Sequence, residues 1–220
     1  MAIRVGVAGA AGKMGLAVCE AVEGADDLVL AAQVDPALGV DLADVLGDID
    51  VLVDFTRPDV AVANINAATA AGVHVVVGTS GFDISQVQTD GGGKVLFAPN
   101  FAIGAVLMMR LAAQASKYMP KVEIVELHHD QKLDKPSGTA KRTAEMIEEA
   151  SGKTDIEIHS VRLPGIIANQ EVIFGELGQT LTIRHDTTDR KGFMPGVLIA
   201  IRRVADMDGD VVVGLEHVLD

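Results

Sequence analysis

The chain has 220 residues, 49% of them hydrophobic, so it can bury a substantial core in one large domain or two small ones. Its 31 acidic residues outnumber the 18 basic ones and give a formal net charge of -13, which disfavours nucleic acid as a partner. It lacks a signal-peptide pattern, and no apolar run approaches the roughly 20 residues that cross a bilayer. The single cysteine, Cys19, allows neither an intrachain disulfide nor a cysteine-rich metal site. We therefore expect a cytoplasmic protein with no nucleic-acid or membrane partner.

Short apolar runs alternate with helical patterns over roughly the first hundred residues. Ile3 to Ala8 has the pattern of a buried strand, and a glycine turn then leads into helical spacing from Met14 to Val22. Pro58 introduces a second helical segment, which Gly72 closes. Further strand-like runs lie at residues 28–34, 50–55, 74–78 and 94–98. Strands that alternate with helices predict an α/β fold, with a Rossmann-like, doubly wound parallel sheet.

The pattern changes after a helical stretch at residues 103–118. Four segments then alternate partly between apolar and polar residues, which predicts antiparallel strands with one covered face, at residues 122–129, 156–163, 170–177 and 179–185. Helical spacing returns at 193–206, and another apolar run follows at 211–219. A second, α+β domain with an open, mostly antiparallel sheet is therefore expected to begin near residue 103.

The first glycine turn, VAGAAGKMG, indicates a dinucleotide site. Gly9, Gly12 and Gly15 follow a predicted strand and open a predicted helix, where glycines allow close backbone approach and helix N–H groups attract a pyrophosphate. Asp35 ends the second predicted strand about 20 residues later, where a carboxylate can bind ribose hydroxyls. The alternative is a glycine turn that only permits tight helix packing.

The residues near Asp35 bear on the choice of cofactor. Pro36 occupies the position that often supplies an arginine to an adenosine 2′-phosphate. Lys13, within the glycine turn, can reach that phosphate instead, although it can equally be a solvated surface lysine. We expect NADH to be accepted, and NADPH as well if Lys13 serves in this way.

The segment HHDQKLDKPSGTA, residues 128–140, concentrates groups that transfer protons and bind anions. His128 and His129 point to opposite faces unless their strand ends there, and their spacing does not suit a metal site. Histidine exchanges protons near neutral pH, and Lys132 can donate a proton or hold a carboxylate. Gly138 and Thr139 open a predicted helix, where N–H groups and a hydroxyl can bind a carboxylate. The plainer interpretation is a capped helix beside two surface histidines.

Several blocks in one order resemble the 4-hydroxy-tetrahydrodipicolinate reductase family, also called dihydrodipicolinate reductase, of bacterial diaminopimelate and lysine synthesis. They are GAAGKMG, DFTRPD at 54–59, GTSGF at 78–82, APNFAIG at 98–104, the histidine segment and FMPGVLIAIRRV at 193–204. The resemblance implies reduction of 4-hydroxy-tetrahydrodipicolinate, a small cyclic dicarboxylate, with hydride from NADH or NADPH. It departs from the family's pattern at Ser80 and Ala102, where threonine and serine are common. The stretch between Asp35 and Asp50 is also compressed, which implies a more open adenosine pocket.

The resemblance also implies residue roles. His128 is the proton donor or acceptor and Lys132 the proton donor, and the substrate is bound by His129, Gly138 and Thr139. The dinucleotide is held by Gly9, Ala10, Ala11, Gly12, Lys13, Met14 and Asp35, and its nicotinamide end is lined by Gly78, Thr79, Ser80, Ala98, Pro99, Asn100 and Phe101. No metal is implied.

The family's architecture implies a dinucleotide-binding domain at residues 1–102 and 194–220. A substrate-binding domain at 103–193 would use its open sheet to form a homotetramer. Two other functions stay open: another two-domain nicotinamide-dependent dehydrogenase of an amino-acid derivative, and a non-catalytic dinucleotide sensor. A semialdehyde dehydrogenase would need a catalytic cysteine in the second domain, whereas Cys19 lies in the first predicted helix and is interpreted as a core residue.

Overall fold

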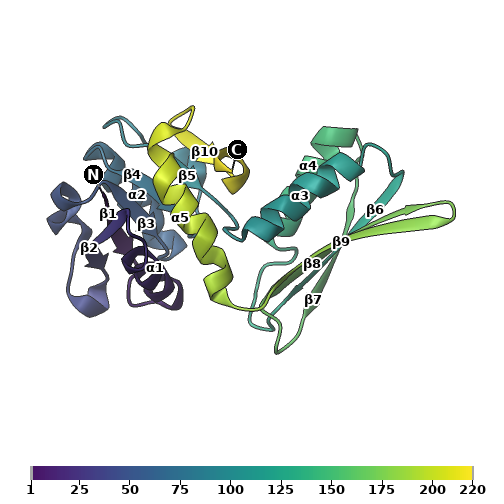
Figure 1. Ribbon diagram of the computed structural model, residues 1–220, viewed down its shortest axis with the longest axis horizontal. Coiled ribbons are helices and arrows are strands. Elements are labelled where there is room, and N and C mark those ends of the chain that lie inside the picture. The colour runs from purple at the N-terminus through teal and green to yellow at the C-terminus, as the bar shows by residue number, and fades with distance from the viewer. Residues whose placement is uncertain (1, 220) are drawn as a thin grey trace. The chain divides into compact units, whose positions relative to one another are not determined.

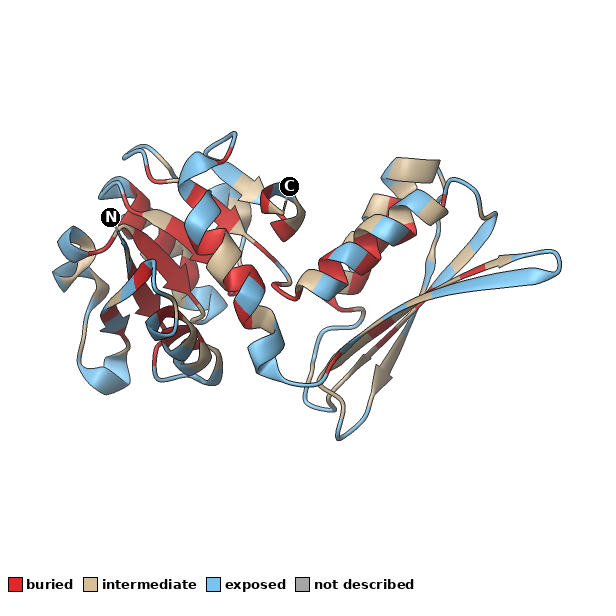
Figure 2. Cartoon of the chain, viewed as in Figure 1, coloured by how far each residue is buried: buried red, intermediate tan, exposed pale blue. Residues whose placement is uncertain are grey.

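The computed structural model describes residues 2–219, which form two compact units (Figure 1). The first unit extends to Phe101 and resumes at Phe193, and the second comprises Ala102–Gly192. Buried residues gather in the strands of the first unit and along one side of the helices of the second (Figure 2). Each unit therefore has a core of its own.

A parallel six-stranded sheet forms the centre of the first unit, with the order β10-β5-β4-β3-β1-β2. Its strands are short runs rich in valine, as expected where both faces of a parallel sheet are covered. They are β1 (Ile3–Ala8), β2 (Leu28–Val34), β3 (Val51–Asp54), β4 (His74–Val77), β5 (Val95–Phe97) and β10 (Val211–Val213). The predicted doubly wound parallel sheet is confirmed, and the last apolar run of the sequence supplies its edge strand.

Three helices flank this sheet: α1 (Lys13–Glu23), α2 (Pro58–Ala70) and α5 (Met194–Arg203). The chain passes from β1 to β2 in one direction along the sheet and from β3 to β4 in the other, so right-handed crossovers place α1 and α2 on opposite faces. Helix α5 packs against α1 and shares its face. The sheet is therefore covered on both sides, and the carboxyl ends of β1, β2 and β3 meet at one edge.

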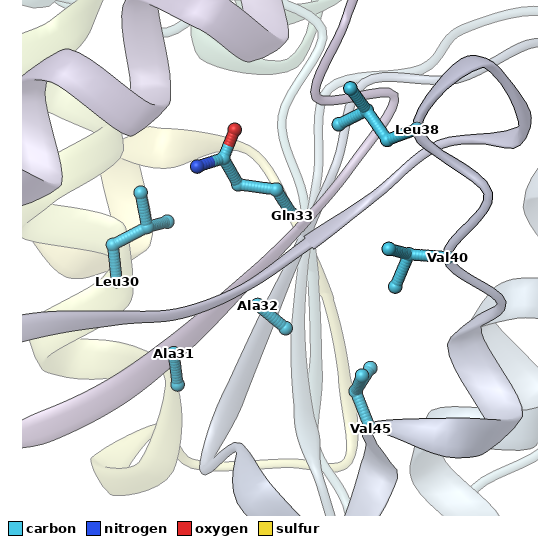
Figure 3. A pocket seen from close by; sticks show the side chains of 7 residues that line it. All are labelled: Leu30, Ala31, Ala32, Gln33, Leu38, Val40 and Val45. Carbon is cyan, nitrogen blue, oxygen red and sulfur yellow. The ribbon is translucent and has the colours of Figure 1, made fainter.

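The connection from β2 to β3 contains no α-helix. It consists of three 3-10 turns, Pro36–Leu38, Leu42–Asp44 and Leu46–Asp48. Figure 3 shows the hollow between this connection and β2, which has a volume of about 430 Å³ and is lined mainly by small and aliphatic side chains, among them Ala32, Leu38 and Val45. The compressed stretch between Asp35 and Asp50 thus covers its end of the sheet with turns alone.

The second unit has a four-stranded sheet with the order β7-β6-β8-β9. The strands are β6 (Lys121–His128), β7 (Glu157–Arg162), β8 (Ala168–Glu176) and β9 (Gln179–Thr187), and helices α3 (Ile103–Ala115) and α4 (Gly138–Ser151) pack against them and each other. β8 is antiparallel to β6 and β9, as predicted. The antiparallel interpretation was wrong for β7, which is parallel to β6, because α4 forms a crossover between these two strands.

One face of this sheet carries the core, and no helix among residues 2–219 lies over the other (Figure 1). The register places Ile124 opposite Val172 and Val122 opposite Phe174, and these side chains share the helix-covered face. The opposite face carries the intervening residues, such as Ile173, which are only partly buried. Within residues 2–219, no helix has the length and apolar character needed to span a bilayer.

Candidate functional site

The glycine turn brings three backbone segments close together. Gly9 has a φ of 79°, and a Cβ there would overlap the carbonyl oxygen of Phe55. A Cβ on Gly15 would overlap the carbonyl oxygen of Gly9, so the first turn of α1 packs directly against the glycine turn. Gly12 precedes the helix without a side-chain cap, and the first N–H groups of α1 lack intrahelical acceptors by geometry. This turn therefore combines tight packing with N–H groups that can bind an anion.

Asp35 lies at the end of β2 and is tied to the glycine turn. Its Oδ2 accepts a hydrogen bond from the Ala11 N–H at 3.1 Å, and its Oδ1 accepts one from the Ala37 N–H at 2.9 Å. Asp35, Gly9 and Gly12 line a single cavity of about 660 Å³. The exposed Lys13 is not among the described residues that line it. The structure thus brings Asp35 and the glycine turn together but leaves Lys13 at the surface.

Asp54, at the end of β3, is a buried carboxylate that sequence reasoning missed as a site residue. Its Oδ1 accepts hydrogen bonds from the Thr56 N–H at 3.1 Å, the Thr56 hydroxyl at 2.8 Å and the Thr79 hydroxyl at 2.6 Å. Its Oδ2 accepts one from the Asn64 amide at 2.9 Å. Thr56 and Asn64 also line the cavity. The sequence signal that could have identified it is an acidic residue at the end of a buried strand. In the structure, Asp54 holds the residues that form one wall of the cavity.

Phe55 joins the two segments expected near the nicotinamide. A Cβ on Gly78, just after β4, would overlap the Phe55 ring. The Phe55 ring also lies 5.8 Å from the ring of Phe101, centroid to centroid, in a tilted arrangement. Thr79 and Ala98 are buried, whereas Ser80 and Pro99 are exposed. Residues 78–80 and 98–101 therefore meet around one aromatic side chain in the first unit.

In the second unit, β6 ends at His128, where the polar segment after it begins. Glu126 lies two residues earlier on the same face of the strand, and its Oε2 is 2.5 Å from the His128 Nδ1. Burial lowers the pKa of His128 below its usual value, although the neighbouring Glu126 acts to raise it. The imidazole is therefore neutral near pH 7.

Glu126 is fully buried and is paired with Arg162 of β7. The guanidinium donates two parallel hydrogen bonds to the two carboxylate oxygens, each of 2.7 Å, and the Ser137 N–H donates a third at 3.2 Å. Burial acts to raise the pKa of Glu126, but hydrogen bonds from Arg162, Ser160 and His128 outweigh it and lower the pKa to about 2. Sequence reasoning missed this pair, although an acid on the apolar face of β6 was a signal.

Lys132 lies in the loop after β6 and forms an ion pair of 2.8 Å with Asp134. Burial acts to raise the pKa of Asp134, but Lys132 lowers it overall. Arg162 donates hydrogen bonds to the carbonyl oxygens of Lys132, at 3.3 Å, and Asp134, at 2.7 Å. The charge of Lys132 also lowers the pKa of His128. The two predicted proton-transfer residues are thus close enough to interact.

The N-terminus of α4 lies next to this group. Ser137 caps the helix by accepting a hydrogen bond from the Ala140 N–H at 3.2 Å, and its own N–H binds Glu126. Space around the Gly138 Cα is open, since a Cβ there would contact no atom within 4 Å. His128, Lys132, Gly138 and Thr139 therefore gather at one end of the sheet, and His129 directly follows β6. Residues 2–219 contain no cluster of three or more metal-binding side chains.

Comparison with known proteins shows the family to which the chain belongs. The family model "Dihydrodipicolinate reductase, N-terminus" matches residues 3–101, and "Dihydrodipicolinate reductase, C-terminus" matches residues 104–219. The chain belongs to the dihydrodipicolinate reductase family. A 4-hydroxy-tetrahydrodipicolinate reductase from Nocardia farcinica is 45% identical over 249 residues and covers all of both chains. Another from Streptococcus thermophilus is 48% identical over 259 residues, again with full coverage.

A solved member of the dihydrodipicolinate reductase family has the same fold. This dipicolinate-bound reductase from Paenisporosarcina sp. TG-14 is 37% identical, has a TM-score of 0.85, and covers all of both chains. The alignments with the Nocardia and Streptococcus reductases are longer than the 220 residues of this chain, so they contain gaps on its side. The family assignment makes the chain an oxidoreductase with a nicotinamide-nucleotide domain.

Proposed function

We propose that this protein reduces 4-hydroxy-tetrahydrodipicolinate to tetrahydrodipicolinate in the diaminopimelate route of lysine biosynthesis. The observation that carries the proposal is the full-length match to a dipicolinate-bound reductase, on a chain whose second unit gathers His128 and Lys132 beside a helix N-terminus. Dipicolinate resembles the substrate, because both molecules are cyclic dicarboxylates. The reaction adds a hydride and a proton to the substrate and releases water from its 4-hydroxy position.

The start of α4 suits one substrate carboxylate. Gly138 has open space around it, and the Gly138 and Thr139 N–H groups belong to the first turn of a 14-residue helix, whose dipole favours an anion. The Thr139 hydroxyl adds a donor. The ammonium of Lys132 and the ring of His129 can bind the same substrate from the preceding loop. We assign substrate binding to these groups.

The residues of the first unit fit a nicotinamide dinucleotide. The glycine turn forms a cradle that Cβ atoms would fill, and Asp35 lines the adjoining cavity. When bound, the dinucleotide supplies the hydride. Residues 9–14 would hold its pyrophosphate, Asp35 a ribose, and residues 78–80 and 98–101 its nicotinamide end. Because Asp35 is a carboxylate and Lys13 is exposed at the turn, we infer acceptance of both NADH and NADPH, with a modest lean to NADH.

His128 and Lys132 would manage the proton. His128 is neutral near pH 7 because burial lowers its pKa, so it can accept or pass on a proton. Lys132 carries an ammonium beside Asp134 and can donate. The orientation of the bound ring would be fixed by its carboxylate at α4, which brings the reacting atoms to these two side chains.

The uncovered face of the second sheet supports a homotetramer. Its residues alternate with the core residues, and side chains such as Val125, Leu127 and Ile173 are only partly buried there. A second copy that packs on this face would cover them. We also assign the protein to the cytoplasm, since its relatives are named 4-hydroxy-tetrahydrodipicolinate reductases, whose substrate and nicotinamide cofactor are metabolites of that compartment. Sedimentation of the purified protein tests the assembly, and a monomer at micromolar concentration would contradict it.

A coupled assay tests the reaction. Dihydrodipicolinate synthase generates the unstable substrate in the cuvette, and oxidation of NADH or NADPH is followed by absorbance. We expect oxidation that requires both the synthase product and this protein. Turnover only with a semialdehyde or another amino-acid derivative would indicate a different dehydrogenase. Binding of NADH without turnover of either substrate would indicate a dinucleotide sensor.

A further inference from the structure

We propose that Glu126 and Arg162 form a positioning pair, which fixes the proton of His128 on Nδ1 and holds the loop that carries Lys132. The catalytic consequence rests on the proposed function. The arrangement itself is a property of the second unit and can be measured without substrate.

The contact between Glu126 and His128 determines which ring nitrogen carries the proton. An ionised carboxylate can only accept hydrogen bonds, and Glu126 is ionised because Arg162 and its other partners lower its pKa to about 2. The short contact of 2.5 Å to Nδ1 therefore requires a proton on Nδ1. Neutral His128 then has its lone pair on Nε2, the nitrogen left to exchange a proton with the substrate.

Arg162 makes this buried carboxylate tolerable. A fully buried ionised glutamate is strongly unfavourable unless it is paired and its oxygens are hydrogen-bonded. Both oxygens receive a guanidinium N–H at 2.7 Å, and further hydrogen bonds come from the Ser137 N–H on Oε1, from His128 on Oε2 and from the Ser160 side chain. The two functions of Glu126 are thus to orient the histidine and to anchor the residue that caps α4.

The guanidinium also reaches the lysine loop. Its Nη2 donates to the carbonyl oxygen of Asp134 at 2.7 Å, and its Nε donates to that of Lys132 at 3.3 Å. Arg162 is itself mostly buried, with a side-chain exposure of 7%. A single pair therefore connects the end of β6, the loop from His129 to Pro136 and the start of α4, which are the three segments that carry the candidate catalytic and substrate groups.

The charged groups around His128 fix the direction of its response to pH. Glu126 on its own strand acts to raise its pKa, whereas Lys132 in the following loop and Arg162 on β7 act to lower it. On the other side, β8 places the uncharged Ala168 opposite His128. Removal of the Glu126 charge should therefore lower the pKa of His128 further, so that the imidazole becomes protonated only at lower pH.

The test is the protonation of His128 measured by 15N NMR on histidine-labelled protein, with the His128→Asn variant to assign its signals. In the wild type we expect the proton on Nδ1 near neutral pH. In Glu126→Gln, an amide replaces the carboxylate and leaves Arg162 without a charge partner. The double variant Glu126→Gln/Arg162→Gln removes this unpaired charge. In both variants the proton should leave Nδ1 for Nε2 in a large fraction of molecules, and the ring should titrate at lower pH.

Turnover separates positioning from plain stability. The double variant should regain the melting temperature lost in Glu126→Gln but keep a kcat reduced at least about tenfold, because the histidine still lacks its acceptor. Glu145→Gln is the matched control, since Glu145 pairs with Arg142 at the exposed surface of α4. Wild-type protein with the proton on Nε2, or a double variant with normal tautomer and kcat, would overturn the proposal. If the wild type did not reduce 4-hydroxy-tetrahydrodipicolinate, the proposed function would be wrong. The NMR result would still decide whether the pair positions His128.

Discussion

The low pKa of Glu126 predicts that acid weakens the second unit. The ordinary pKa is 4.5 and the folded value is about 2, so the unfolded chain binds this proton more tightly. A carboxyl group with a lowered folded pKa contributes stability that is present above pH 4.5 and is lost as the pH falls through about 2. Each pH unit between the two values is equivalent to about 1.4 kcal/mol, so the whole contribution is about 3 kcal/mol.

The experiment compares two variants that share His128→Asn. This change removes the titration of the histidine and leaves an N–H donor beside Glu126. One variant keeps Glu126 and Arg162, and the other carries Glu126→Gln and Arg162→Gln as well. Urea unfolding is followed by far-UV circular dichroism, because Tyr118, the only tyrosine in a chain without tryptophan, is exposed and would report unfolding weakly. The difference between the two variants isolates the contribution of the pair.

We expect the variant with the intact pair to lose up to about 2 kcal/mol more unfolding free energy between about pH 5 and about pH 3 than the variant without it, the full value requiring that the amide at position 128 replaces the hydrogen bond of the histidine. The smaller figure arises because about pH 3 lies above the folded pKa, where the contribution is only partly lost. Equal losses in the two variants would refute the reasoning. That result would mean that Glu126 has an ordinary pKa in the folded protein and that Arg162 does not hold it ionised.

Four further predictions concern the proposed reaction. His128→Ala or Lys132→Ala should lower kcat about a hundredfold or more, because a positioned acid or base is lost, while calorimetry shows an unchanged Kd for NADH. Gly15→Ala should weaken NADH binding at least several-fold in the same calorimetry, because its Cβ would overlap the carbonyl oxygen of Gly9 and displace the turn. Lys13→Ala should raise the Kd of NADPH several-fold more than that of NADH, and the difference should shrink at high salt as screening grows; equal effects would assign Lys13 to the pyrophosphate or to the surface. Scattering with NADH and dipicolinate should show the two units closer than without ligands, since hydride transfer requires both sets of residues to meet, and hinges near residues 103 and 193 would absorb the motion.

Local patterns predicted most of the fold. The valine-rich runs gave the parallel strands because their side chains are buried on both faces, and the alternation from Val122 to His128 identified a strand with one covered face. The pairing of β7 could not be predicted in this way. Its alternation resembles that of the other strands, and only the intervening helix α4 makes its pairing with β6 parallel.

The candidate site was predictable where the groups lie close together in the sequence. His128, Lys132 and Gly138 fall within one segment of eleven residues, and the end of β6 brings them to one end of the sheet. Arg162 was missed because it is 36 residues away from Glu126 and reaches it only through the pairing of β6 with β7. Asp54 was missed for a related reason, since two of its partners, Asn64 and Thr79, come from α2 and from the end of β4.

The pairing of Lys132 explains how a protein with a net charge of -13 can bind a dicarboxylate. In the free protein the Asp134 carboxylate forms an ion pair with the Lys132 ammonium at 2.8 Å, and the side chain of Asp134 is 53% exposed. A substrate carboxylate that reached Lys132 would displace Asp134 into water, where a carboxylate is well solvated. The exchange keeps one anion beside the ammonium before and after binding. Arg162 is not suited to the same exchange, because its partner Glu126 is fully buried. Of Lys132 and Arg162, the arginine is therefore committed to structure and the lysine is available to the substrate.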